Sequence, residues 1–63
     1  MEKDMKMIAN MAKFGDAFER SLAETIDRAS SVDYRKMSNV FSDYFEKFRA
    51  EKWKGVRAPH REE

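Results

Sequence analysis

Apolar side chains recur along this chain every three or four positions, and this spacing constrains the fold more than any other feature. The pattern runs from Ile8 to Ala29 and again from Tyr34 to Phe48, with one break at Ser30-Ser31-Val32. Such a period is typical of amphipathic helices that bury one face. The sequence therefore predicts an all-α fold, in which two helices form an antiparallel hairpin.

The expected helix boundaries follow from the break in this pattern. We expect the first helix to span residues 3–29 and the second to span residues 32–54. Ser30 has the position of an N-cap residue and Asp33 follows three positions later, which is typical of a capping box. One continuous helix is the alternative, because no glycine or proline marks the break.

Glycine and proline occur at three further positions that bear on the hairpin. Gly15 lies inside the apolar seam of the first helix and costs about 1 kcal/mol of helix propensity there, so we expect a close helix crossing as compensation. Gly55 is expected to stop the second helix, and Pro59 prevents its continuation. Residues 1–55 then form the hairpin, and residues 56–63 form a flexible basic tail.

The apolar faces are wider than a lone hairpin can bury. Each covers an arc of roughly 140–160°, which requires contact with two neighbouring helices. The chain has 63 residues and no cysteine, so disulfides cannot supplement its small core. We expect two hairpins to dimerise into a four-helix bundle, with a different protein on the same face as the alternative. The residues expected in the core and dimer interface are Ile8, Met11, Phe18, Leu22, Ile26, Phe41, Tyr44, Phe45 and Phe48.

No pattern of catalytic or ligand-binding residues stands out. The serines have no histidine base nearby, His60 is the one histidine, and no Gly-rich phosphate loop occurs. We therefore expect a protein that is not an enzyme and holds no metal, cofactor or small-molecule substrate. The N-terminus lacks the apolar run of a signal peptide, and no segment is apolar over the length of a membrane span. A cytoplasmic location is the expectation.

One polar patch on the first helix has the composition of a nucleic-acid surface. Its members fall within about 100° of one another on the helix, and they are Lys3, Lys6, Asn10, Lys13 and Phe14. Lysines can hold phosphates, and an aromatic ring can stack on a base. An ordinary solvated face is the alternative reading of the same residues.

The run Asn10-Met11-Ala12-Lys13-Phe14 resembles the first helix of the Rop family, the plasmid-encoded repressors of primer. That family forms a helical hairpin of similar length, which dimerises into an antiparallel four-helix bundle and binds paired RNA loops through its first helix. The resemblance implies RNA contacts for Lys3, Asn10, Lys13 and Phe14. Phe18 and Thr25 stand where the family's RNA face carries a glutamine and a lysine, and the second helix here is far more aromatic.

A basic segment near the C-terminus is a second candidate binding region. Between Lys47 and Arg61 there are six basic residues and one acid, Glu51. Its candidate partner-binding residues are Lys52, Trp53, Lys54 and Arg57. Trp53 lies beyond the edge of the apolar stripe, so it either folds over the end of the bundle or forms an exposed anchor.

These features favour a small regulatory or adaptor protein that acts by protein–protein interaction, with itself and with a protein partner. The chain is also similar in size and style to the small early-region proteins of lambdoid phages, which implies a phage or plasmid origin and a regulatory role. The alternative is a Rop-like RNA-binding regulator or another nucleic-acid-binding module. The salt dependence of the binding affinity distinguishes the two hypotheses, because binding to phosphates weakens steeply as the salt concentration rises.

Overall fold

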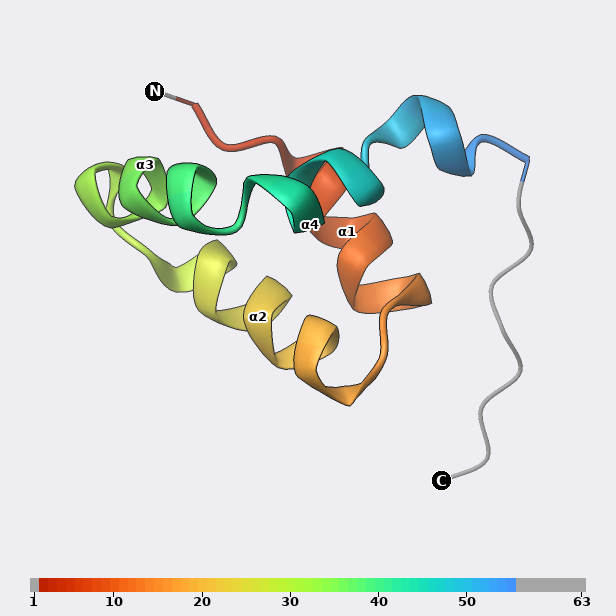
Figure 1. The fold of residues 1–63 in the computed structure, drawn as a ribbon, viewed down its shortest axis with the longest axis horizontal. Helices are drawn as coiled ribbons and strands as arrows, with labels where there is room; N and C mark the ends of the chain where they lie inside the picture. The colour runs from red at the N-terminus through yellow and green to blue at the C-terminus, as the bar shows by residue number, and fades with distance from the viewer. Residues whose placement is uncertain (1, 56–63) are drawn as a thin grey trace.

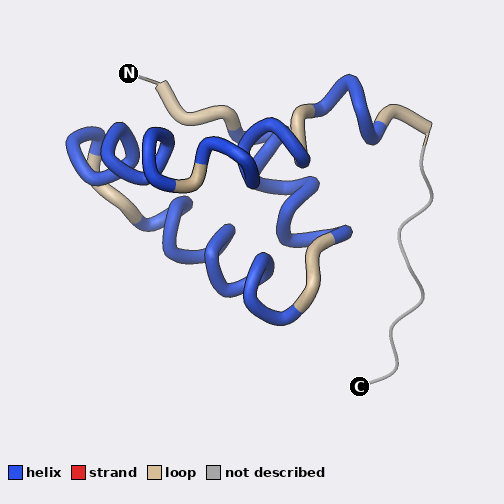
Figure 2. Tube along the Cα trace, in the orientation of Figure 1, coloured by secondary structure: helices blue, strands red, loops and turns tan. Residues whose placement is uncertain are grey.

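The computed structural model describes residues 2–55, and this part of the chain contains helices and no strands (Figure 1 and Figure 2). The all-α prediction is therefore confirmed. The elements in chain order are α1 (Met5–Phe14), α2 (Ala17–Arg28), α3 (Ser31–Val40), α4 (Ser42–Lys47) and a 3₁₀ turn, η1 (Ala50–Trp53).

The predicted continuous helix over residues 3–29 is wrong, because the chain turns between α1 and α2. Gly15 ends α1, and a Cβ atom built on it would lie 2.5 Å from the carbonyl oxygen of Met11. Asp16 then caps α2 in a reciprocal capping box with Glu19. The two helices pack against each other (Figure 1). Gly15 thus permits a tight turn and does not lie at a crossing inside one long helix.

The predicted helix over residues 32–54 starts as expected but is divided. The hydroxyl oxygen of Ser30 accepts a hydrogen bond from the Asp33 backbone N–H at 3.2 Å, so the predicted N-cap is confirmed. The α3 helix ends at Val40, and α4 is a separate short helix. Within the last turns of α3, the Ser38 hydroxyl donates to the Arg35 carbonyl at 2.7 Å, a bond that competes with the helical ladder.

The chain after α4 is also irregular. Phe48 follows α4 with a φ of −105°, and Arg49 is extended before η1 begins. Gly55 has a φ of 81° and comes directly after Lys54, the residue that caps η1. The helix that Gly55 was expected to stop has already ended at Lys47, so the predicted extent of that helix is wrong. The predicted tail over residues 56–63 lies outside the described residues.

The buried core draws on α1, α2 and α3 and on Phe48, which directly follows α4. Its apolar members are Met7, Ile8, Met11, Leu22, Ala23, Ile26, Tyr34 and Phe48. Five of the nine residues predicted for the core and interface are among these, and Phe41, Tyr44 and Phe45 pack partly buried against them. Phe18 is the exception: its side chain is 54% exposed, so it lies outside the core of the single chain, and its place in a dimer interface stays a prediction.

Two contacts attach the N-terminal segment to the rest of the fold. The Tyr34 hydroxyl oxygen accepts a hydrogen bond from the Asp4 backbone N–H at 3.0 Å, and the Tyr34 ring packs against Phe45. Lys3 donates through Nζ to the backbone carbonyl of Asp27 near the end of α2. The entry to α1 is thereby held against both α2 and α3. Among residues 2–55, no helix has the length and apolarity needed to cross a membrane.

Candidate functional site

A groove between α1 and η1 brings together residues that were predicted for two separate sites. It is lined by Asp4, Lys6, Ala9, Asn10, Arg49, Glu51, Trp53 and Lys54, and we call it the basic groove. Lys6 and Asn10 belong to the predicted nucleic-acid patch. Trp53 and Lys54 belong to the predicted partner-binding segment. The chain reversals place these two sets on one surface, with a cavity volume of about 870 Å³ between them.

Trp53 folds over the end of the helices, which decides between its two predicted positions. Its ring is stacked with Phe14 at a centroid distance of 4.5 Å and with Phe48 at 5.3 Å. Its Nε1–H donates to the backbone carbonyl of Lys47 at 2.6 Å. The indole is half-buried and contributes to the lining of the basic groove. It is therefore both a structural clamp and part of the candidate site.

The predicted nucleic-acid patch is largely used within the chain. The Asn10 side-chain amide donates to the backbone carbonyl of Phe48 at 3.1 Å, and Phe14 is stacked on Trp53. Lys3 is bonded to the C-terminal part of α2. Lys6 and Lys13 are the exposed members of the set. Asn10 and Phe14 are therefore positioned mainly as tethers that hold the C-terminal segment against α1.

Some charged residues that line the basic groove have partners within the chain, and others make no ion pair among the described residues. Asp4 is the N-cap of α1, and its Oδ1 accepts from the Met7 backbone N–H at 3.0 Å, so the partial positive charge of the helix N-terminus offsets its carboxylate. Arg49 lies 4.0 Å from Glu46, at the limit of an ion pair between exposed groups. Among the described residues, no ion pair joins Lys6 or Lys54 to another side chain.

The rest of the predicted partner-binding segment lies beside the groove or outside the described residues. Lys52 is exposed on η1, next to the lining residues Glu51 and Trp53. Arg57 lies outside the described residues.

A second surface is formed by three aromatic rings, which we call the aromatic patch. Phe18 lies 5.6 Å from Tyr44 and 6.5 Å from Phe41 between ring centroids, and Phe41 lies 6.1 Å from Tyr44. Val40 adjoins Phe41 and is 75% exposed. The rings pack on one another in tilted geometries that aromatic pairs favour. Phe18 is exposed, whereas Phe41 and Tyr44 are half-buried against the core.

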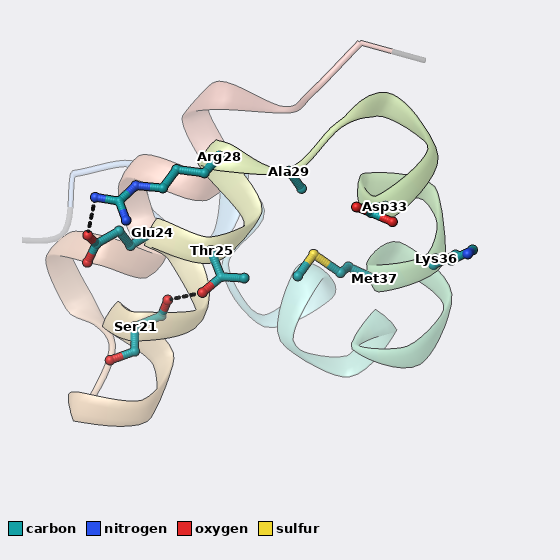
Figure 3. A pocket seen from close by; sticks show the side chains of 8 residues that line it. All are labelled: Ser21, Glu24, Thr25, Arg28, Ala29, Asp33, Lys36 and Met37. Atoms are coloured by element: carbon teal, nitrogen blue, oxygen red, sulfur yellow. Dashed lines mark hydrogen bonds and ion pairs between the residues drawn. The ribbon is translucent and has the colours of Figure 1, made fainter.

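A cleft lies between α2 and α3 (Figure 3). The α2 side carries Glu24 and Arg28, which form an ion pair at 2.7 Å, and the α3 side carries Asp33 and Lys36. Met37 lies between the two sides (Figure 3). Phe18 precedes the cleft residues of α2 by one turn, and Phe41 follows Met37 by one turn. Phe18 and Phe41 therefore lie about one helical turn from the cleft, on its α2 side and its α3 side.

The most buried charged group is one that the sequence reasoning missed. Glu19 is 3% exposed, and its two carboxylate oxygens accept from the Asp16 backbone N–H at 2.9 Å and from Lys47 Nζ at 2.7 Å. The hydrogen bond to Glu19 raises the pKa of Lys47 above its ordinary value of 10.5. The pattern Asp16-x-x-Glu19 directly after a glycine was the available signal for this helix start. Because both oxygens are engaged, the pair acts as a clamp between α2 and α4.

Comparison with known proteins gives no relative for this chain: no family model, no curated protein and no solved structure matches it. The resemblance to the Rop family therefore stays a prediction that rests on residues 10–14.

Proposed function

We propose that this chain is a small non-enzymatic regulatory or adaptor protein that acts through protein–protein contacts. The observation that carries the proposal is the exposure of the aromatic patch. Phe18 is 54% exposed although two further rings lie beside it. Clustered exposed apolar side chains mark interaction sites, and aromatic residues dominate the energetics of protein interfaces.

A second copy of the chain is the occupant that this surface fits best. A two-fold symmetric interface requires a surface that complements itself. Each side of the α2–α3 cleft carries one acid and one base, so rotation about a two-fold axis can set acid against base across the interface. The rings of the aromatic patch would then pack against those of the second copy. A small chain also gains most from burying such a patch, because its own core is limited.

We favour protein binding over nucleic-acid binding because of where the candidate RNA contacts lie. Rop-like recognition would need the Asn10 amide and the Phe14 ring at the surface of the first helix. Here the Asn10 amide bonds to Phe48, and the Phe14 ring stacks on Trp53. Both would have to leave contacts within the chain before they could bind RNA.

Sedimentation equilibrium of three proteins tests this proposal. We expect the wild type to form dimers, and Phe18→Asp to remain monomeric because a buried unpaired charge is costly at an interface. Val32→Asp is the matched control, since Val32 is an apolar residue outside the patch and cleft that is 64% exposed, against 54% for Phe18. Both variants should keep the helical circular dichroism of the wild type, because both positions are exposed.

The possible contrary results separate the alternatives. A wild type that stays monomeric at every concentration would overturn pairing with a second copy. Affinity capture from the native cell lysate then decides the broader proposal. A protein retained by wild type and Val32→Asp but lost with Phe18→Asp would assign the patch to a different partner. RNA or DNA retained equally by all three proteins, with no protein dependent on Phe18, would refute the proposed function.

A further inference from the structure

We infer that the basic groove between α1 and η1 binds an acidic peptide segment of a partner protein. This inference rests on the proposed function, since it names the chemistry of the partner that a regulatory adaptor would engage. It concerns a surface separate from the aromatic patch, so the two surfaces can be occupied at the same time.

The charge of the groove fits carboxylate side chains. Lys6 from α1, together with Arg49 and Lys54 from the C-terminal segment, contributes three cations to the lining. Of the two acids, Asp4 is occupied in capping α1, which leaves Glu51 as the acid without a capping role. Lys6 and Lys54 make no ion pair within residues 2–55, so an acidic segment that binds these two lysines would break no existing pair, and Arg49 lies at the 4.0 Å limit of its pair with Glu46.

The apolar part of the groove favours a peptide over a phosphate backbone. Ala9 and the indole of Trp53 provide apolar lining between the cations, which suits the mixed polar and apolar side chains of a peptide. Proteins that bind single-stranded nucleic acid stack bases on open aromatic faces. Here the Trp53 ring is already stacked with Phe14 and Phe48. Glu51 would also repel a phosphate within the same groove.

Trp53 allows a direct binding measurement, because it is the sole tryptophan of the chain and it lines the groove. The probe is a short synthetic peptide of aspartate, glutamate and leucine, titrated into the full chain at low salt. We expect a saturable change in tryptophan emission that weakens as salt screens the charges. The same peptide with lysine in place of every acid should give no saturable change.

Charge reversals locate the site on the groove. Lys6→Glu and Lys54→Glu should each weaken binding of the acidic peptide about fivefold, the effect of losing one well-placed ion pair. Arg35→Glu is the matched control, since Arg35 is an exposed cation on α3 that does not line the groove, and it should leave the affinity nearly unchanged. Equal weakening by all three variants, or no saturable binding by wild type, would overturn the inference.

Two further measurements complete the test. Oligouridylate that binds more tightly than the acidic peptide and competes with it would also overturn the inference and assign the groove to nucleic acid. Phe18→Asp should bind the acidic peptide as well as wild type does. If the chain self-associates through Phe18 but does not bind the peptide, the proposed role of the basic groove is refuted and that of the aromatic patch stands. If the chain binds the peptide but Phe18→Asp changes neither self-association nor partner capture, the proposed role of the aromatic patch is refuted and that of the groove stands.

Discussion

Phe48 closes the core of this protein, and its truncation is the sharpest test of the packing. The side chain is 0% exposed, and its ring is stacked with Trp53 at 5.3 Å. Its backbone carbonyl also accepts from the Asn10 amide, a bond that alanine would preserve. Phe48→Ala therefore removes the ring contacts while leaving the backbone tether in place.

The expected loss is large compared with the stability of so short a chain. Replacing a buried phenylalanine by alanine costs about 3–5 kcal/mol, a range that already includes the lost ring contacts. At ~0.05–0.15 kcal/mol per residue, a chain of 63 residues has a free energy of unfolding of about 3–9 kcal/mol. Phe48→Ala should consequently remove most or all of the stability.

Urea denaturation followed by far-UV circular dichroism and tryptophan emission measures this loss. Phe45→Ala is the matched control: Phe45 is half-buried, and we expect a loss of about 0.8–1.5 kcal/mol, half of the roughly 1.5–3 kcal/mol for burying a full ring. In Phe48→Ala the emission of Trp53 should already be red-shifted without urea. If the two variants unfold at the same urea concentration and both keep the wild-type emission, Phe48 does not close the core as described.

Three further substitutions test the local structure. Gly15→Ala should lower the free energy of unfolding by about 1–3 kcal/mol because the new Cβ would overlap the Met11 carbonyl oxygen. If urea denaturation instead shows a free energy of unfolding raised by about 1 kcal/mol, the chain would form a continuous helix at this position. Ser30→Ala should cost about 1 kcal/mol by the loss of the α3 cap, and an unchanged thermal midpoint would contradict that role. The raised pKa of Lys47 means that its bond to Glu19 stabilises the fold below about pH 10.5 and loses this effect as pH rises through the raised value. Lys47→Met should therefore show a smaller drop in urea midpoint between neutral and strongly alkaline pH than wild type, and equal drops would count against the clamp.

The local features of the fold could be predicted from the sequence because they depend on residues within one helical turn of each other. The helical spacing identified Ile8, Met11 and Ile26 as buried residues, and all three are buried. The Ser30 cap was recognised for the same reason, since its partner lies three positions away. The turn at Gly15 had an equally local signal in the capping box, but the wide apolar seam favoured the interpretation as one helix.

The candidate site could be predicted only in pieces. Lys6 and Lys54 were each identified as cations of a binding region, but nothing in the spacing of the chain indicated that they would line one groove. Their proximity depends on the turn at Gly15 and on the irregular segment at Phe48, where the predicted helices do not continue. Phe18 shows the converse case, because helical spacing cannot distinguish a core position from an exposed position on the same apolar stripe.

By itself, the sequence determined the helical character of the chain, the start of the helix after Ser30 and most of the buried side chains. These properties arise from backbone hydrogen bonding and side-chain spacing over three or four residues. Only the tertiary structure decided which surfaces meet. The Asn10 amide bonds to the carbonyl of Phe48 across 38 positions, and the stack of Phe14 on Trp53 spans a similar separation. Such contacts depend on the direction of every intervening turn, so the groove and the aromatic patch exist only in the folded chain.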